Sequence, residues 1–229
     1  KKYNTKIILG GGIVTSEPEL MSRALNIDYA VIGEGEETVV QLLSTIKNDD
    51  DLSSVDGIGY FKDNQFVLTQ NRKPIANLNS LPFPDYDGFN FNKYLDLMKP
   101  NDQFAYDIFD YPREYPIITS RSCPFSCTFC YHPIGKKYRQ RSVDSIMEEL
   151  ETIIPKYHIN IVSIYDELFS HNKERVNEFC RRFSEFIKTI PWEIKWFCQM
   201  RVVNIKKDML EMMRDAGCFM VSYGFESYN

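Results

Sequence analysis

The sequence predicts an α/β protein in two parts, and three observations support this prediction. Short apolar segments alternate with amphipathic ones at both ends of the chain, which indicates strands and helices in turn. Prolines and aromatic residues interrupt this alternation between 71 and 115. A Cys-x-x-x-Cys-x-x-Cys sequence directly follows an expected strand in the second part. We therefore expect an α/β domain at 1–70, a linker at 71–115 and a second α/β domain at 116–229.

The first part contains the signals of a small sheet with crossover helices. Gly10, Gly11 and Gly12 stop the first apolar segment, and Thr15-Ser16 followed by Pro18 predicts a helix start. The expected elements are strands at 6–9, 28–32, 58–61 and 66–69, the last two forming a hairpin, and helices from about 15 and from about 33 to 47.

The linker is expected to pack on the protein and not to behave as a flexible tether, because it is rich in aromatic residues. The second part shows longer amphipathic periods, and Gly217 is placed to end its last helix. Its expected elements are strands at 116–120, 160–165, 194–199 and 218–223 and helices at 143–156, 172–189 and 205–216.

Composition excludes several classes of protein. The chain of 229 residues is 43% hydrophobic, which predicts a packed core, and its net charge of −5 disfavours a nucleic-acid-binding surface. No apolar run reaches the roughly 18 residues that a membrane span needs, and the first residues lack the features of a signal peptide. Three closely spaced cysteines suit a metal site in a reducing compartment better than a disulfide framework. We therefore expect a cytoplasmic location.

The cysteine cluster is the strongest candidate site. Cys123, Cys127 and Cys130 can reach three corners of an iron–sulfur cluster and leave the fourth iron without a protein ligand. One alternative is a structural zinc site with His132 as the fourth ligand, and another is three independent buried thiols. The remaining cysteines, in apolar segments, are expected to be buried; these are Cys180, Cys198 and Cys218.

The sequence Cys123-Pro-Phe-Ser-Cys127-Thr-Phe129-Cys130 resembles the signature of the radical S-adenosylmethionine (SAM) enzymes. The resemblance implies that the three cysteines hold a four-iron, four-sulfur cluster whose free iron binds SAM. It also implies reductive cleavage of SAM to a 5′-deoxyadenosyl radical, with Phe129 at the cofactor site. The electron would come from a single-electron donor such as flavodoxin or ferredoxin.

Polar residues follow the other three expected strands, where a β/α barrel collects its chemistry. Asp166 and Glu167 resemble the family's Asp-Asp-x-Phe pattern, which receives the SAM amino group, and Arg201 would pair with the SAM carboxylate. Glu226 resembles the acid of a Gly-x-Glu-Ser pattern near the SAM ribose, with Ser222 on the strand before it.

Plainer interpretations exist for these charged residues. Asp166 and Glu167 could be N-cap acids of the helix expected from 172, and Arg201 a solvated arginine. The basic residues after the cysteines are expected to form a wet surface; these are His132, Lys136, Arg139 and Arg141.

The first part resembles the C-terminal half of a doubly wound, Rossmann-like cobalamin-binding domain. The resemblance is carried by the glycines at 10–12 and by the sequence Asp28-Tyr29-Ala-Val-Ile-Gly-Glu-Gly-Glu-Glu37. It implies that Gly10, Gly11 and Gly12 lie against the nucleotide tail of cobalamin. The family's upstream Asp-x-His-x-x-Gly loop does not occur here, and only the first strands of a partial (β/α)6 radical SAM barrel fit before 229. We therefore expect the chain to be the middle of a longer protein.

The leading hypothesis is thus a cobalamin-linked radical SAM enzyme acting on a small molecule by methyl transfer or by anaerobic oxidative cyclisation, as in magnesium-protoporphyrin ester cyclisation. The sequence does not identify the substrate. Two alternatives are a non-catalytic zinc-stabilised binding module and a cobalamin carrier that has lost radical chemistry.

Overall fold

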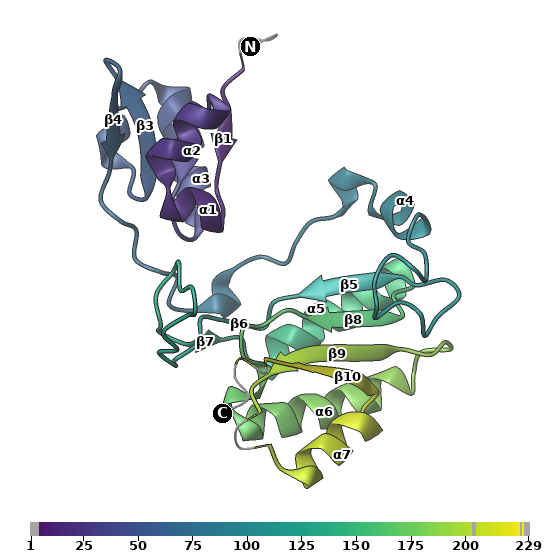
Figure 1. The fold of residues 1–229 in the computed structure, drawn as a ribbon. Coiled ribbons are helices and arrows are strands. Elements are labelled where there is room, and N and C mark those ends of the chain that lie inside the picture. The colour runs from purple at the N-terminus through teal and green to yellow at the C-terminus, as the bar shows by residue number, and fades with distance from the viewer. Residues whose placement is uncertain (1–4, 203–204, 225, 227–229) are drawn as a thin grey trace. The chain divides into compact units, whose positions relative to one another are not determined.

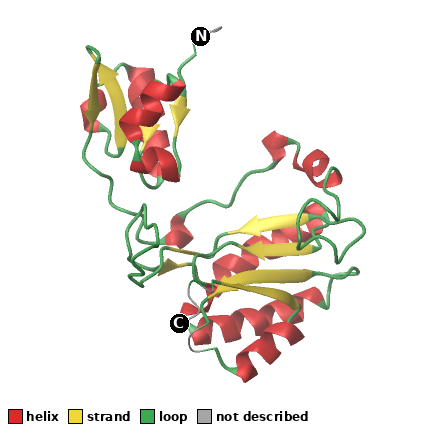
Figure 2. Cartoon of the chain, viewed as in Figure 1, coloured by secondary structure: helices red, strands yellow, loops and turns green. Residues whose placement is uncertain are grey.

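The structure, a computed structural model, describes residues 5–202, 205–224 and 226. Contacts between Cα atoms divide the chain into two compact units. The first comprises Lys1–Ala76 with Ser126–Lys136, and the second comprises Asn77–Phe125 with Lys137–Asn229. Each unit has its own sheet (Figures 1 and 2).

The sheet of the first unit has the strand order β1-β2-β3-β4. Strands β1 (Ile8–Leu9) and β2 (Tyr29–Val31) are parallel, whereas β3 (Ile58–Lys62) and β4 (Gln65–Leu68) form an antiparallel hairpin beside β2. The expected hairpin is therefore confirmed. Its two turn residues, Asp63 and Asn64, both have positive φ angles, as a tight hairpin of this twist requires.

Helices cover both faces of this sheet. Alternate residues of β2 point to opposite faces, so Ala30 packs with Val14 of α1 (Gly12–Ser16), and Val31 packs with Leu42 of α3 (Gly35–Asn48). Helix α2 (Pro18–Leu25) lies on the α1 side. The first unit therefore has the layered α/β architecture that the sequence predicts.

A helix does begin at Pro18, but the hydroxyl cap expected at Thr15-Ser16 is wrong. Both residues lie inside α1, which begins at Gly12, and α2 then begins at Pro18 with Glu17 between the two helices. The Thr15 hydroxyl does not cap a helix but accepts a hydrogen bond from the Gly33 amide at 3.0 Å. A hydroxyl of the kind that commonly caps a helix thus accepts a hydrogen bond from the backbone of a neighbouring loop.

The second unit contains the parallel sheet expected of a partial barrel, with strand order β10-β9-β8-β5. The three pairings within this sheet are all parallel. Its strands are β5 (Glu114–Ile117), β8 (Ile161–Ile164), β9 (Lys195–Met200) and β10 (Cys218–Tyr223). Because the strands are parallel, their carboxyl ends meet at one edge, and the cysteine loop follows the carboxyl end of β5.

Three helices cover one face of this sheet, as Figure 1 shows. They are α5 (Val143–Tyr157), α6 (Lys173–Ile187) and α7 (Lys207–Asp215). Buried Trp196 of β9 packs against α6 and donates an indole hydrogen bond to the Ala216 carbonyl at 2.9 Å. Gly217 follows α7 with φ +90°, so it ends the helix as predicted.

The linker residues that belong to the second unit cover the other face of the sheet. Ala105 and Tyr106 pack against Ile161 and Phe197. Earlier in the linker, Phe91 of α4 (Phe91–Asp96) packs in the main core of this unit. Within the described residues, short 3-10 turns lie in the linker at Leu78–Ser80 and Asp87–Phe89 and elsewhere at Leu52–Ser54 and Phe169–His171.

The strand expected at 116–120 is divided in the structure. Strand β5 ends at Ile117, and after a two-residue break β6 (Ser120–Arg121) pairs with β7 (Arg139–Gln140) as a separate antiparallel ribbon. The chain thus leaves the main sheet just before the cysteines, and the ribbon joins the two ends of the loop that contains them.

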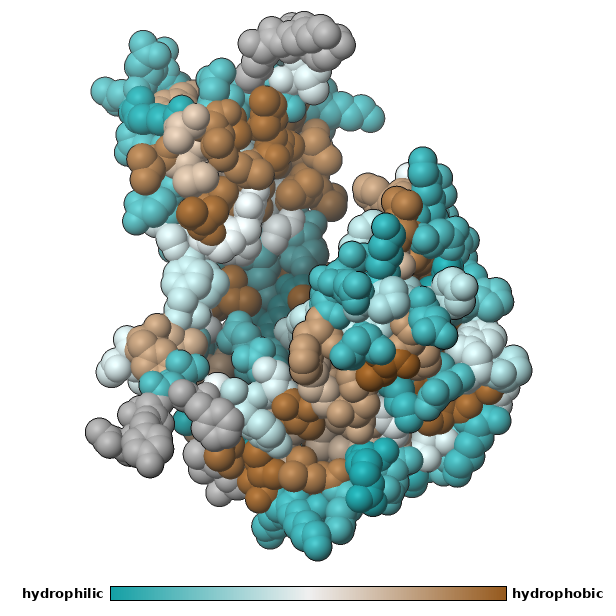
Figure 3. Space-filling view, turned by 45° about the vertical axis from the view of Figure 1, so that its right-hand side comes forward, coloured by the Kyte–Doolittle hydropathy of each residue, from teal (hydrophilic) through white to brown (hydrophobic). Residues whose placement is uncertain are grey.

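Apolar residues gather on the face of the first unit that Figure 3 turns to the viewer. Exposed apolar side chains of this unit include Ile13, Leu20 and Val40, which are 64%, 61% and 69% exposed. Across the described parts of the chain, no helix combines the length and the apolar character that a membrane span requires.

Candidate functional site

The three cysteines of the motif occupy the loop that follows β6. All three thiols are free; Cys123 and Cys127 are half-buried and Cys130 is exposed. A backbone hydrogen bond of 3.1 Å from the Cys130 amide to the Cys127 carbonyl closes a turn between the last two. Among the described residues, no three potential ligands are gathered closely enough to hold a single metal ion.

The donor set fits an iron–sulfur cluster nonetheless. Such a cluster spreads its irons over a cube, so its thiolate ligands need not meet at one ion. Accessible thiols on a short loop can bind it, whereas thiols sealed in a core cannot. The Ser122 hydroxyl, next to Cys123, is buried and has no hydrogen-bond partner among the described residues. It is thus an unused hydrogen-bond donor at the edge of the loop.

The segment leading into Cys123 is buried and sharply turned. Thr119, Ser120 and Ser122 are 0%, 2% and 1% exposed. Ser122 has φ +66°, in the left-handed region that costs a residue with a side chain about 1–2 kcal/mol. Such strain persists only where the surroundings enforce it, and it concentrates at functional sites.

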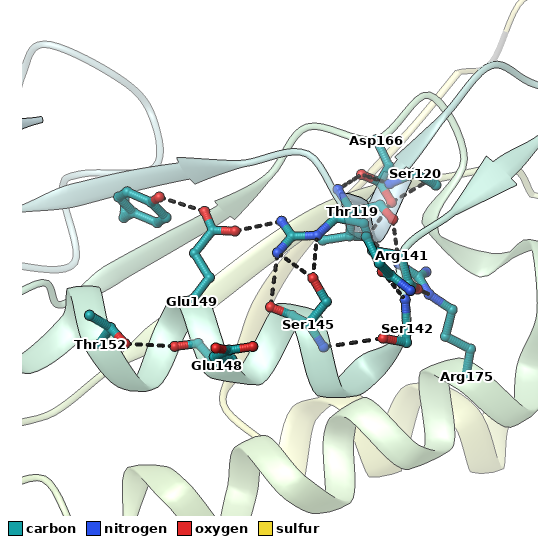
Figure 4. A network of polar contacts seen from close by, with 12 residues as sticks. Thr119, Ser120, Arg141, Ser142, Ser145, Glu148, Glu149, Thr152, Asp166 and Arg175 are labelled. Carbon is teal, nitrogen blue, oxygen red and sulfur yellow. Dashed lines mark hydrogen bonds and ion pairs between the residues drawn. The ribbon is translucent and has the colours of Figure 1, made fainter. Parts of the chain in front are cut away.

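Asp166, at the end of β8, provides much of that enforcement. Its buried carboxylate accepts hydrogen bonds from the amides of Thr119 and Ser120 at 2.6 and 2.9 Å, and from their hydroxyls at 2.5 and 2.7 Å (Figure 4). A carboxylate has about four acceptor positions, so these bonds occupy its capacity. The described partners of Asp166 are therefore groups of the protein, in contrast to the SAM amino group expected from the sequence.

A buried arginine holds the same turn from its other side. The Arg175 guanidinium donates to the Thr119 carbonyl and hydroxyl at 2.9 and 2.5 Å, and to the Arg141 carbonyl at 3.2 Å. Burial lowers the pKa of Arg175 from its ordinary value, while the negative charge of Asp166 opposes that shift. The Thr119 hydroxyl thus lies between a buried carboxylate and a buried guanidinium: it donates a hydrogen bond to Asp166 and accepts one from Arg175.

The network continues to helix α5. Arg141 forms an ion pair of 2.5 Å with Glu149, which also accepts a hydrogen bond of 2.5 Å from the Tyr115 hydroxyl (Figure 4). Glu149 is 2% exposed. Burial, with Glu149 as a second cause, raises the pKa of Tyr115.

Two of the basic residues expected on a wet surface do not lie there: Arg139 is buried and Arg141 is half-buried. Arg139 is 6% exposed, and the Arg141 side chain, 11% exposed, is paired with Glu149. The expectation is wrong for both residues. For Arg141 the reason is that the acid that neutralises it, Glu149, lies eight residues along the chain on an otherwise apolar helix face. Lys136 is exposed and hydrogen-bonds the Ser126 hydroxyl at 3.1 Å, while His132 is half-buried.

The helix-cap interpretation of Asp166 and Glu167 is also wrong. Helix α6 begins at Lys173, and the Asn172 side chain caps it by accepting a hydrogen bond from the Arg175 amide at 3.0 Å. Glu167 is exposed at the carboxyl end of β8.

Arg201 lies beside the cysteine loop. Its guanidinium carbon is 3.9 Å from the ring centre of Phe125, between Cys123 and Cys127, in the geometry of a cation–π contact. The arginine is half-buried, so the solvated-arginine interpretation does not describe it. This contact puts a fixed positive charge next to the loop.

Ser222 is exposed on β10 and lines a pocket of about 230 Å³ between the sheet and the linker residues 103–105. Gln199, Tyr165 and Phe104 line the same pocket. Glu226 lies beyond the carboxyl end of β10 and is exposed, and Phe129 is 65% exposed.

The glycine loop of the first unit contacts part of the cysteine loop. The Tyr131 hydroxyl donates to the Gly12 carbonyl at 2.7 Å and also contacts the Ser16 hydroxyl. Gly11 has φ +103°, which favours glycine, and a Cβ there would meet nothing within 4 Å. Gly10 and Gly12 are exposed too, but a Cβ at Gly10 would meet Val31 at 3.4 Å and a Cβ at Gly12 would meet the Tyr131 ring at 3.5 Å, so the open space lies at Gly11.

The remaining cysteines lie in the core, as predicted. Cys180, Cys198 and Cys218 are 1%, 0% and 8% exposed. Burial raises the pKa of Cys180 to about 12 and also raises that of Cys198. They behave as small apolar residues and not as thiolate ligands.

Sequence reasoning missed the network behind the loop. Thr119 and Ser120 fell in an expected strand and Arg175 in an expected helix, and no local pattern marked any of the three as a site residue. One usable signal was Glu149, which lies among Ile146, Leu150 and Ile153 on the apolar face of its helix. A lone acid on such a face needs a buried partner.

Comparison with known proteins now gives this site a family. Residues 117–229 match the radical SAM superfamily, and this segment of the chain belongs to that superfamily. An uncharacterised methyltransferase of Pyrococcus horikoshii is 32% identical over 228 residues, covering 98% of this chain and 46% of its own length. The anaerobic magnesium-protoporphyrin IX monomethyl ester cyclase of Cereibacter sphaeroides is 26% identical over 215 residues, covering 91% of this chain and 33% of its own length. The chain thus spans less than half of these relatives.

Solved structures share the fold across nearly the whole chain. The cobalamin-dependent SAM radical enzyme OxsB, solved with aqua-cobalamin and SAM bound, superposes with a TM-score of 0.72 at 21% identity, covering 96% of this chain and 31% of its own. The radical SAM methyltransferase TsrM from Kitasatospora setae, solved with cobalamin and a [4Fe-4S] cluster bound, has a TM-score of 0.71 at 16% identity, covering 99% and 42%. The expected fold class is confirmed.

Proposed function

We propose that this chain is part of a cobalamin-linked radical SAM enzyme that acts on a small-molecule substrate. The observation that carries the proposal is the loop of three free thiols at the carboxyl end of a parallel sheet, within the segment that matches the superfamily. The relatives support methyl transfer or anaerobic oxidative cyclisation as the reaction, because they are named as a methyltransferase and a cyclase.

In this proposal Cys123, Cys127 and Cys130 hold a four-iron, four-sulfur cluster. When bound, the cluster supplies the electron that cleaves SAM reductively to a 5′-deoxyadenosyl radical. The loop contributes only three ligands and so leaves a position for SAM. The electron would come from a flavodoxin or ferredoxin, and the reduced thiols suit the cytoplasm.

The SAM site would be lined by the polar residues at the strand ends. Arg201, held beside the loop by Phe125, is placed to pair with the SAM carboxylate. Glu167 would receive the amino group, and Glu226 with Ser222 would lie near the ribose. Phe129, exposed between Cys127 and Cys130, would pack against the bound cofactor. Asp166, whose acceptor positions are occupied, is left to position the loop.

Cobalamin would lie against Gly10, Gly11 and Gly12. The support is the open space at Gly11 and the exposed apolar side chains of the first unit. The zinc-module alternative receives no support from the comparisons, since the relatives are named as enzymes.

Anaerobic reconstitution of the full-length protein tests the proposal. Wild-type protein treated with iron and sulfide should turn brown and contain near-stoichiometric four-iron clusters. Cys123→Ala, Cys127→Ala and Cys130→Ala should each abolish cluster retention, whereas the control Cys180→Ala, in the core, should retain it. Protein that stays colourless and keeps stoichiometric zinc after this treatment would overturn the proposal.

A further inference from the structure

We propose that Asp166 is a positioning residue: together with Thr119 and Arg175 it fixes the turn that presents Cys123, and it thereby controls how firmly the loop retains its cluster. This inference rests on the proposed function, because it assumes that the loop binds iron. It assigns Asp166 a role through the protein backbone and not through contact with SAM.

The first argument is the number and direction of the bonds. Four donors from two consecutive residues converge on one carboxylate, and two of them are backbone amides. Amide bonds fix the path of the main chain itself, whereas side-chain bonds alone would leave it free to move. Thr119 is held further through its carbonyl, which accepts from the Arg141 amide and from Arg175, both at 2.9 Å.

The second argument is the strained residue between this turn and the first ligand. Ser122 adopts φ +66° although it is not glycine. The bonds at Thr119 and Ser120 hold the chain on one side of Ser122, and Cys123 follows on the other. A left-handed serine immediately before a ligand therefore indicates that the direction of Cys123 is specified by the fold.

The third argument is burial. Asp166 is 1% exposed and Arg175 is 5% exposed, with the Thr119 hydroxyl bonded to both. A buried acid that loses its charge leaves four donors without their anionic acceptor and a buried arginine without a counter-charge. The same geometry makes the arrangement sensitive to the Thr119 hydroxyl.

The test compares two substitutions of Thr119 in the full-length protein. Thr119→Val keeps the shape and removes the hydroxyl, whereas Thr119→Ser keeps the hydroxyl and removes a methyl group. If the site requires only packing, the valine should be the milder change. If it requires the bond to Asp166, the serine should be the milder one. Asp166→Asn completes the set, and Asp208→Asn, on the surface beside Lys173, is its matched control.

Two measurements are made. In apo protein, hydrogen exchange of the peptide containing Thr119–Ser122 should be at least tenfold faster in Thr119→Val and Asp166→Asn than in wild type, Thr119→Ser and Asp208→Asn. In reconstituted protein, the first two variants should lose iron to a chelator about ten- to a hundredfold faster, because loss of an outer partner of a metal site typically lowers metal affinity by about that factor and we expect the weaker retention to appear in the rate of loss.

The outcomes separate the inference from the proposed function. Wild-type protein that takes up no iron would overturn the proposed function, and the role of Asp166 in cluster retention with it. Wild type that loads normally, with Thr119→Val and Asp166→Asn matching it in both measurements, would overturn this inference alone. A milder effect for Thr119→Val than for Thr119→Ser would also overturn it, because packing would then suffice. Should Asp166→Asn fail to fold, the two Thr119 variants still decide the matter.

Discussion

The segment that ends at Ser122 and the loop that follows it differ in burial and in hydrogen bonding. The approach to the cysteines comprises residues 119–122, and its Thr119, Ser120 and Ser122 are almost wholly buried. Hydrogen bonds join the approach to elements distant in sequence. The loop that follows, residues 123–130, has an exposed Cys130 and a Phe129 that is 65% exposed. The protein thus fixes the base of the loop and leaves the thiols accessible. A cofactor that must bind a second molecule needs this combination of a firm attachment and an open face.

Breaking the buried ion pair behind the approach should have the largest effect. Glu149→Gln leaves Arg141 without its counter-charge in a site that is 2% exposed at Glu149. We expect the free energy of unfolding of the second unit to fall by about 3–5 kcal/mol. Urea denaturation measures it, with Glu185→Gln as the control, because Glu185 pairs with Arg181 on the surface and should contribute less than about 0.5 kcal/mol. Equal effects of the two changes would show that the network does not stabilise the unit.

The exposed residues around the cysteine loop predict a change in the affinity for SAM without a change in iron content. Glu226→Ala, beyond the carboxyl end of β10, should weaken SAM binding about ten- to hundredfold, the cost of a lost charged hydrogen bond to a bound ligand. Isothermal titration of reconstituted full-length protein measures it, with Glu185→Ala as the control. Unchanged affinity would remove Glu226 from the proposed SAM site.

The contact between the cysteine loop and the glycine loop predicts a smaller effect. Tyr131→Phe removes the 2.7 Å hydrogen bond to the Gly12 carbonyl and should destabilise the first unit by about 0.5–1.5 kcal/mol. Thermal unfolding followed by circular dichroism measures it. Tyr111→Phe is the control, because its ring is 83% exposed, and it should change the midpoint little. A midpoint unaffected by Tyr131→Phe would show that the bond does not hold the loop.

Relieving the strain at Ser122 should have the smallest effect and the opposite sign. Glycine adopts φ +66° without a steric cost, so Ser122→Gly should stabilise the second unit by about 0.5 kcal/mol after the entropy of the unfolded glycine is counted. Ser120→Gly, which removes a hydroxyl bond to Asp166, should instead destabilise it. If Ser122→Gly proved strongly destabilising, the strain argument would be wrong.

Local patterns predicted most of the fold. Periodicity located the strands and longer helices to within a few residues, and Gly217 marked a helix end because its φ of +90° suits glycine. Two of the failures share a cause. Thr15 looked like a cap, but its hydroxyl serves the Gly33 amide, and Arg141 looked solvated, but it pairs with Glu149. Such partners are chosen by the tertiary fold, and no local pattern specifies them.

The candidate site divides in the same way. The cysteine motif is contiguous, so the sequence displays it completely. The residues that support the motif are Thr119, Asp166 and Arg175. Asp166 lies 47 residues after Thr119 in the sequence, and Arg175 lies 56 residues after it. Their association depends on the pairing of β5 with β8 and on the placement of α6. Sequence alone could propose Asp166 as a site residue, but not which group it contacts.

The central claim is that the loop holds a cluster with one iron open to SAM. Electron paramagnetic resonance of the reconstituted, dithionite-reduced full-length protein, recorded before and after SAM is added, tests it most directly. We predict a reduced four-iron cluster whose signal changes when SAM binds, since SAM would enter the coordination of the open iron. A signal identical with and without SAM, or no iron–sulfur signal at all, would contradict the account.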